Sequence, residues 1–266
     1  IIRKIVGDPV WERAYNKAKI SENFDDFQVK NYGLSISLQK KVRNYSIKKS
    51  DIVITPSKHL KDFILNLGFK NKIKMINNGV NIPMKNGKMF TNDQINITTV
   101  SRLVTHKNIE KIIGAISDLN NPSIKLNIIG DGPEQNQLQS VSLRSNNREN
   151  IIFHGKLNRE DINNIFLNSD IYIQASNYEG LPHSLLEAMS YGIPVLCTPV
   201  GECKELLGNE DRGYLLDLPV SKDNIKSKIN EIVIDKNIAT IKGKEGKDFV
   251  SEKYNLANTF SLYKNL

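Results

Sequence analysis

The amino-acid sequence predicts an α/β protein built on parallel sheets. From residue 95 onward, short apolar runs alternate with segments of helical apolar spacing, the pattern of strands joined by crossover helices. Earlier in the chain, DIVITPS (51–57) reads as a buried strand, HLKDFILNLGF (59–69) as a helix and KIKMINNGV (72–80) as a short strand. The polar segment 82–93 contains Pro and Gly and is expected to be a linker between two such units.

The first unit is the less regular of the two. Residues 1–45 are mostly polar, and amphipathic helical pieces are expected at 9–19 and 32–49. Ser57 is a favourable N-cap for the helix that follows DIVITPS, and Gly68 is expected to end that helix.

The second unit alternates regularly between strands and helices. The strands are expected at 95–100, 123–130, 151–155, 170–176, 193–198 and 213–217. The helices are expected at 108–119, 133–145, 159–169, 182–191, 201–207, 221–235, 237–253 and 255–265. Because ligands of parallel sheets bind beyond the carboxyl ends of the strands, the loops that follow these strands are the candidate site segments.

The most informative segment is SNYEGLPHSLLEAMSYGIPVLCTPVG (176–201). Pro182 suits the first position of a helix, so Glu179 is expected beside a helix N-terminus, where free N–H groups and the helix dipole favour an anion. Glu187 follows on the same helix face as His183. A carboxylate in such a place needs hydrogen-bond donors, and the hydroxyls of a ribose or a sugar would supply them.

This segment resembles the Glu-x7-Glu signature of retaining glycosyltransferases with the GT-B fold, of the family 4 type (glycosyl transferases group 1). Five further blocks resemble segments of that family in the same order. They are IVGDPVWERA (5–14), the approach to the linker (51–81), SRLVTHKNIEKIIGAI (101–116), IIGDGPE (128–134) and IIFHGKL (151–157). The resemblance runs over nearly the whole chain.

The resemblance implies a GT-B fold of two Rossmann-like domains with parallel sheets and an active site in the cleft between them. Residues 1–93 are then the remainder of the N-terminal acceptor-side domain plus the linker, and 94–248 form the nucleotide-sugar donor-binding domain. Residues 249–266 form a C-terminal helix that crosses back towards the first domain. The first domain is expected to be incomplete, with its first strands missing, so that the strand at 51–57 would lack neighbours and leave an exposed edge.

The resemblance also implies roles for charged residues. Arg102 and Lys107 would stabilise the charge that develops on a diphosphate leaving group, and Arg102 offers a planar fork for two oxygens. Glu187 would bind the ribose through both hydroxyls, and Glu179 would lie nearer the donor sugar. The plain alternative is a set of solvated surface side chains, which is the usual situation of an isolated Lys or Glu.

Further donor-binding positions follow from the same resemblance. Backbone N–H groups at the start of the Glu187 helix would face the sugar hydroxyls and phosphate, and the turn after the second strand of this unit would approach the nucleotide. The residues after the third strand would lie near the base. These positions are Gly180, Leu181, Pro182, His183, Gly130, Gly132, Lys156 and Leu157. His183 could equally pack against or cap its helix, and Trp11 reads as a half-buried anchor.

The expected reaction is transfer of a hexose, with retention, from a UDP- or GDP-sugar to a lipid-linked or saccharide acceptor. The resemblance implies front-face attack, in which the leaving phosphate helps to take the acceptor proton. No cofactor or metal is expected: the sequence contains no Asp-x-Asp, and His59, His106 and His154 lack metal-site spacing.

Composition sets wider limits. Thirty-seven Lys and Arg face 29 Asp and Glu, giving a net charge of +8, which fits either a solvated Lys-rich surface or attraction to anionic membrane and diphosphate. Cys197 and Cys203 form no disulfide framework, and no apolar run reaches the length of a membrane span. We expect a cytoplasmic protein, associated at most peripherally with the inner face of the membrane, and no nucleic-acid partner.

Three alternatives stay open from the sequence. A nucleotide-dependent oxidoreductase would share the architecture, but no G-x-G-x-x-G follows a first strand. A non-catalytic nucleotide-sugar-binding module, or a subunit that needs a partner for activity, would keep the same donor residues. The epimerases that share the GT-B fold would explain this set of loops less well.

Overall fold

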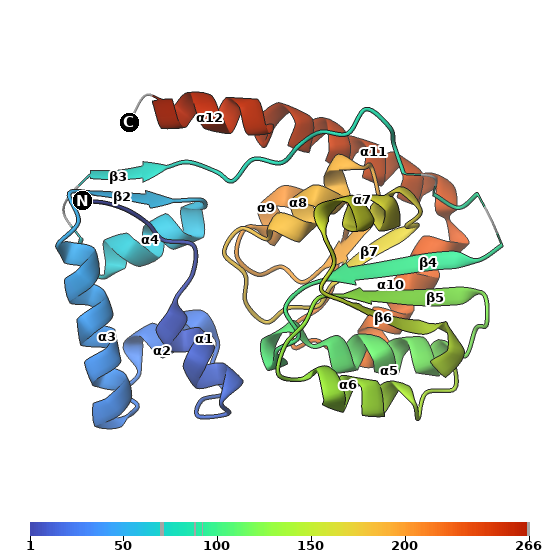
Figure 1. Ribbon diagram of the computed structural model, residues 1–266, viewed down its shortest axis with the longest axis horizontal. Coiled ribbons are helices and arrows are strands. Elements are labelled where there is room, and N and C mark those ends of the chain that lie inside the picture. Colours follow the sequence, from blue (N-terminus) through green and yellow to red (C-terminus); the bar gives the residue numbers. More distant parts are fainter. Residues whose placement is uncertain (70–71, 88, 92, 265–266) are drawn as a thin grey trace.

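The computed structural model describes residues 1–69, 72–87, 89–91 and 93–264 of the 266-residue chain. It contains two all-parallel sheets with helices packed around them, which confirms the predicted α/β class (Figure 1). Positions 88 and 92 of the expected linker, and position 265 of the last expected helix, lie outside the described residues.

The first sheet has the strand order β1-β2-β3, with β1 at Ile2–Lys4, β2 at Ile52–Thr55 and β3 at Lys72–Met75. The expectation that the strand at 51–57 lacks neighbours is wrong. It is the central strand, because the three residues of β1 pair with it in parallel and place Ile2 opposite Ile52. In the described part of the sheet, the free edges are therefore on the two outer strands, β1 and β3.

Four helices accompany this sheet: α1 at Pro9–Asn16, α2 at Phe24–Val29, α3 at Gly33–Lys48 and α4 at Lys58–Asn66. Asp8 caps α1 by accepting a hydrogen bond from Val10 N at 3.0 Å, and its buried carboxylate forms an ion pair with Arg43 of α3. Trp11 of α1 is fully buried rather than half-buried, at 0% exposure. The short helix α2 was not predicted from the sequence.

The second sheet has the strand order β6-β5-β4-β7-β8-β9. Its strands are β4 at Ile95–Val100, β5 at Ile124–Ile129, β6 at Ile151–Gly155, β7 at Ile171–Gln174, β8 at Val195–Cys197 and β9 at Tyr214–Leu215. The chain proceeds outward from β4 to β6, then returns and proceeds in the other direction from β7. The strand order thus reverses between β4 and β7, and the loops after these two strands meet at that point.

Helices cover both faces of this sheet. The helical segments are η1 at Thr105–Lys107, α5 at Ile109–Leu119, α6 at Gln135–Ser142, η2 at Arg148–Asn150, α7 at Arg159–Leu167, α8 at His183–Ser190, α9 at Cys203–Leu207, α10 at Lys222–Ile234, α11 at Lys236–Lys253 and α12 at Leu256–Lys264. Helix α10 packs beside α5, and α11 packs beside α8 (Figure 1).

The last helix, α12, lies against the first part of the chain, beside the segment that follows β3 (Figure 1). Val80 N donates to Tyr254 O at 2.8 Å, and Leu256 N donates to Val80 O at 3.0 Å. Thr259 Oγ1 donates to Asn77 O at 3.2 Å. These contacts join the end of the chain to the segment between the two sheets.

Candidate functional site

The loops after β4 and β7 are tied together at the point where the strand order reverses. Asn108 lies between η1 and α5 in a left-handed conformation, with φ of 53°. Its side-chain amide donates to Ala175 O and to Asn177 Oδ1, each at 2.7 Å. Asn177 N in turn donates to His106 O at 2.7 Å. These hydrogen bonds hold the two loop segments that carry the expected catalytic residues in a fixed position relative to each other.

This fixed position brings Lys107 into contact with Glu179. Lys107 Nζ donates to Glu179 Oε1 at 2.5 Å, and Ser176 Oγ donates to the same oxygen at 2.6 Å. The two charged side chains are only 16% and 13% exposed. The sequence suggested both residues but not this pairing, because they lie 72 positions apart. With its charge balanced, Lys107 can lie at the end of η1, just before the N-terminus of α5, where a lone cation would be unfavourable.

Arg102 links two pockets at this point. One, of about 180 Å³, lies between the two parts of the chain, and its lining includes Arg102, Lys107, Glu179, Gly180 and Leu181. The other, of about 370 Å³, lies over the carboxyl ends of β4, β5 and β6, and its lining includes Ser101, Arg102, Gly130, Lys156 and Leu157. A ligand that spans both pockets would pass the guanidinium of Arg102, as a nucleotide joined to a second group through a diphosphate would.

The floor of the larger pocket depends on the turn after β5. A Cβ on Gly130 would lie 1.9 Å from Ser101 O, and one on Gly132 would lie 2.2 Å from Leu103 O. Only glycine permits this close approach, which Leu103 N reinforces by donating to Asp131 O at 2.7 Å. The hydroxyl of Ser101 is buried and has no hydrogen-bond partner among the described residues. Ser101 is therefore an additional candidate contact for a bound ligand.

The structure does not bring Glu187 into either of these pockets. Glu187 lines a third hollow of about 150 Å³, together with Asn81, Arg159 and Tyr191 among others. Arg159 Nη2 lies 2.8 Å from Glu187 Oε1, and His183 Nδ1 lies 3.2 Å from the same oxygen. The i, i+4 spacing predicts the contact with His183. It cannot predict the contact with Arg159, which comes from the start of α7.

Pro182 lies one position earlier than expected relative to the helix. It is the N-cap residue of α8, and His183 is the first helical residue. The helix ends at Ser190, and Gly192 follows the C-cap residue Tyr191 with φ of 78°. Because Pro182 offers no side-chain cap, the N–H groups of the first turn of α8 remain available to an anion or a hydroxyl.

An aromatic contact fixes the first part of the chain against the site loop. Tyr178, next to Glu179, belongs to the buried core of the first part, where its ring stacks on Phe24 with centroids 4.6 Å apart. Trp11 lies 4.7 Å from Tyr178 and 5.6 Å from His106, between centroids. Burial, together with the smaller effect of the neighbouring cations Lys107 and Arg102, lowers the pKa of His106 to about 3. His106 is therefore neutral at physiological pH.

Glu202 makes a second connection between the two parts of the chain. Its Oε1 accepts a hydrogen bond from His59 N in the first turn of α4 at 3.1 Å. Its own N–H donates to Gly180 O at 3.2 Å, so the same residue supports the site loop. Burial raises the pKa of the Glu202 carboxyl. This residue could not be predicted from the sequence, because a Glu at the start of a helix gives no signal of a partner 143 positions away.

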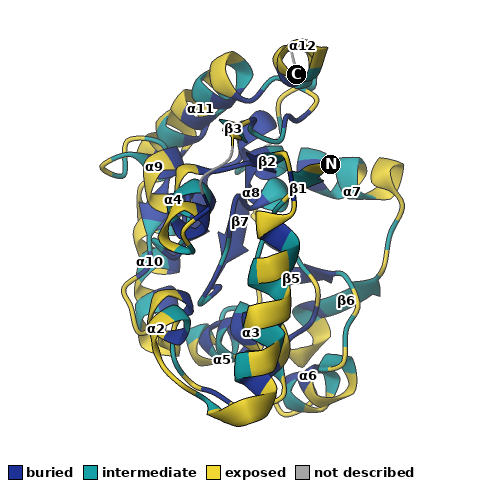
Figure 2. Ribbon diagram, turned by 90° about the vertical axis from the view of Figure 1, so that its left-hand side faces the viewer, coloured by how far each residue is buried: buried dark blue, intermediate teal, exposed yellow. Residues whose placement is uncertain are grey.

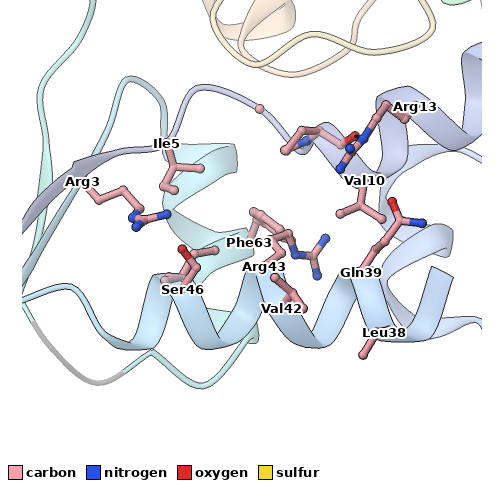
Figure 3. A pocket seen from close by; sticks show the side chains of 13 residues that line it. Arg3, Ile5, Val10, Arg13, Leu38, Gln39, Val42, Arg43, Ser46 and Phe63 are labelled. Atoms are coloured by element: carbon pink, nitrogen blue, oxygen red, sulfur yellow. Dashed lines mark hydrogen bonds between the residues drawn. The ribbon is translucent and has the colours of Figure 1, made fainter. Parts of the chain in front are cut away.

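A separate pocket of about 430 Å³ lies in the first part of the chain, between β1, α1 and α3 (Figure 3). Its lining is mainly apolar and includes Ile5, Val10, Val42 and Phe63, with arginine side chains around it. None of the candidate residues predicted from the sequence lines this pocket. The predicted candidate residues therefore lie around Arg102 and Lys107 rather than here.

The described residues show neither a metal-binding cluster nor a membrane-spanning helix. They contain no group of three or more His, Cys, Asp or Glu side chains placed to hold a metal ion. Within the same residues, no helix combines the length and the apolar character needed to cross a bilayer.

Comparison with known proteins identifies relatives. A family model described as "Glycosyl transferases group 1" matches residues 81–249. An uncharacterized glycosyltransferase of Methanocaldococcus jannaschii is 31% identical over 246 residues, which cover 88% of this chain and 62% of that protein. The O-antigen biosynthesis glycosyltransferase WbnH of Escherichia coli is 32% identical over 231 residues, which cover 85% of this chain and 62% of that protein. The chain thus spans about three fifths of the length of these curated relatives.

A solved structure supports the same architecture. Anabaena HepE, determined in complex with UDP and glucose, superposes with a TM-score of 0.76 at 19% identity, over 87% of this chain and 67% of that one. At this level of identity the likeness establishes the fold.

Proposed function

Because the chain belongs to the glycosyl transferases group 1 family and shares the GT-B fold, we propose that it binds a nucleoside-diphosphate sugar and carries the donor site of a hexosyltransferase. The observation that carries this proposal is the pair of pockets joined at Arg102, with Lys107 and Glu179 in one pocket and the Gly130 turn in the other. The family match also removes the oxidoreductase alternative.

The roles proposed for the site residues follow their positions. The base lies near Lys156 and Leu157, the diphosphate is held by Arg102 and Lys107, and the sugar lies beside Glu179. As the bond between the sugar and the phosphate oxygen breaks, the leaving diphosphate keeps the electron pair, and the two fixed cations stabilise its charge. Glu187 lies outside these two pockets, in the hollow that shares helix α7 with the larger one; we propose that it binds the ribose hydroxyls from there, with Arg159 and His183 orienting its carboxylate.

The finer assignments are proposals too. The donor is a UDP- or GDP-sugar, for which the UDP in the HepE structure is supporting evidence. The acceptor is a glycan or a lipid-linked saccharide, in keeping with the O-antigen relative. Transfer proceeds with retention by front-face attack and without a metal, because Arg102 and Lys107 supply the charge that a metal would. A lipid-linked acceptor and the net charge of +8 favour peripheral association with the inner face of the membrane.

A panel of nucleotide sugars in a thermal-shift assay tests the proposal. UDP-, GDP- and ADP-sugars are added to the chain in the presence of a chelator. A ligand that binds only the folded state stabilises it by about 2.7 kcal/mol at a hundredfold excess over its dissociation constant. Stabilisation by one class of nucleotide sugar in the absence of metal supports the proposal. A shift that requires Mg²⁺ or Mn²⁺ contradicts metal independence, and no shift with any nucleotide contradicts the donor site.

A second candidate is a nucleotide-sugar-binding module that needs a partner subunit for catalysis. This candidate is retained because the chain spans about three fifths of the length of its relatives. The two candidates predict the same binding and differ in turnover. A donor-turnover assay of the chain separates them, because the module binds the sugar nucleotide and leaves it intact.

A further inference from the structure

A carboxylate from the first part of the chain lines the same small pocket as Arg102 and Lys107. Glu12 of α1 lines the 180 Å³ pocket opposite Arg102, Lys107 and Glu179. No role for Glu12 is predicted from the sequence. In the structure it is half-buried, and it faces residues of the donor domain across the junction between the two parts.

The position of this carboxylate is set by the packing around α1. Trp11, the neighbouring residue, is fully buried, and Asp8 caps the helix while it pairs with Arg43. Gly7 leaves room for the carboxylate, since a Cβ at position 7 would lie 2.8 Å from Glu12 Oε1. A side chain held on a capped and anchored helix is suited to contact a ligand with fixed geometry.

Within residues 1–69, 72–87, 89–91 and 93–264, the carboxylate oxygens of Glu12 make no hydrogen bond and no ion pair. The nearby Lys107 is already paired with Glu179. Burial raises the pKa of Glu12, the charges of Asp8 and Glu179 raise it further, and Lys107 and Arg102 oppose that rise. A partly desolvated carboxylate in a pocket is stabilised by a donor, and the charge-assisted bond is a strong one.

The geometry points to Glu12 as a sugar-binding residue that accepts a hydrogen bond from a hydroxyl group of the donor's hexose. This inference rests on the proposed function. The hexose is attached to the diphosphate, so it must lie next to Arg102 and Lys107, and the pocket that adjoins them is the one Glu12 lines. The diphosphate itself carries no donor for Glu12 and repels it. The sugar hydroxyls are therefore the groups that this carboxylate can bind.

Isothermal calorimetry with three variants tests the inference. Glu12→Gln keeps the shape and removes the charge, and Gly7→Ala keeps the charge and displaces the carboxylate. Asp25→Asn removes the same charge from an exposed position on α2 and is the control. Each protein is titrated with UDP and UDP-glucose, and with GDP and GDP-mannose, and thermal unfolding checks that each is folded.

Loss of one charge-assisted hydrogen bond should lower the affinity for the sugar nucleotide, relative to the bare nucleotide, by about tenfold in both Glu12→Gln and Gly7→Ala. Glu12→Gln should bind the bare nucleotide at least as tightly as the parent, since a repulsive charge is gone. The control should match the parent for all four ligands.

Other outcomes overturn the inference. If Glu12→Gln weakens nucleotide and sugar nucleotide equally, Glu12 acts on the nucleotide or on the fold. If Glu12→Gln changes the affinity for neither the nucleotide nor the sugar nucleotide, Glu12 binds no donor sugar. The same follows if the parent binds the sugar nucleotide no more tightly than the bare nucleotide. A parent chain that binds no nucleotide at all refutes the proposed function itself, which is a distinguishable result.

Discussion

Glu179 and Glu187 stand eight positions apart in the sequence but face different partners in the folded chain. Glu179 shares one oxygen between Lys107 and Ser176, in the pocket that opens towards the first part of the chain. Glu187 is held by Arg159 and His183 in a separate hollow. The spacing of a motif therefore sets which residues are near each other along a helix, while the surrounding elements decide what each one binds.

The two carboxylates should respond differently to substitution. Glu187→Ala removes the contacts proposed for the ribose, so it should weaken binding of bare UDP or GDP by about tenfold. Glu179→Ala releases Lys107 for the diphosphate, so bare nucleotide should bind as well as in the parent, and only the effect of the attached sugar should fall. Calorimetry with nucleotide and sugar nucleotide measures both. Equal losses for both ligands in both variants would refute these roles.

Lys107 offers a second test at this scale. In Lys107→Ala, the affinity for a diphosphate should fall more than the affinity for the nucleoside. A charge-assisted bond in a closed site is worth about 1.5–3 kcal/mol, whereas an exposed pair is worth little. Uridine and UDP titrations of parent and variant give the comparison. Unchanged UDP affinity would show that Lys107 serves only to pair with Glu179.

At the scale of elements, the short helix η1 combines the ligand contact proposed for Lys107 with a pH-sensitive fold. It carries His106, which is buried between Trp11 and Tyr15, with Nδ1 placed 3.0 Å from Asn16 Oδ1. Unfolded, this His has an ordinary pKa of 6.5, but in the folded chain burial lowers its pKa to about 3. Below pH 6.5 the unfolded state therefore binds a proton that the folded state does not.

Stability should accordingly fall as the pH drops below 6.5. The contribution of His106 is fully present above its unfolded pKa, and it decreases by about 1.36 kcal/mol per pH unit below that value, or about 2 kcal/mol by pH 5. Urea unfolding of the parent and of His106→Asn at pH 7 and pH 5 measures it. The variant should lose less stability between these two values. A loss as large as the parent's would show that His106 does not drive the dependence.

Much of the second sheet could be predicted from sequence, because its strands are apolar runs bounded by turn residues and its helices carry clear spacing. β1 and α2 were not predicted from the sequence, and there is a physical reason for this. β1 has only three residues and exists because β2, fifty positions later, pairs with it. The same limit applies to the site. Arg102, Lys107 and Glu179 were recognisable by type, but the partners Arg159, Glu202 and Glu12 become visible only when distant elements meet.

At the scale of the whole molecule, the two parts of the chain differ in how completely they are covered. The described part of the first sheet has three strands, and β1 has a free edge. Along α3, Leu34, Leu38 and Val42 are 93%, 63% and 60% exposed, and Figure 2 shows exposed residues along this helix. The six-stranded sheet, in contrast, has helices on both faces. We therefore expect the first part to open more readily.

Limited proteolysis should show this difference. Early cleavage of the chain should concentrate before residue 94, because local opening exposes the backbone of the less covered part, and added nucleotide should protect the donor domain. Mass spectrometry of the fragments locates the cuts. Early cuts spread evenly along the chain, or concentrated after residue 94, would contradict this expectation.

Trp11 gives the molecule an intrinsic optical reporter. It is the one tryptophan in the sequence, and its indole is fully buried between Tyr178, which adjoins Glu179, and His106, which adjoins Lys107. A nucleotide sugar that shifts either neighbour changes the surroundings of the indole, so its emission should respond without any attached dye. Titration of fluorescence excited selectively at the indole would then follow occupancy in real time, and stopped-flow mixing would time the arrival and departure of the ligand. The anchor that joins the two halves of the protein is thus also a spectroscopic signal placed beside its proposed reaction centre.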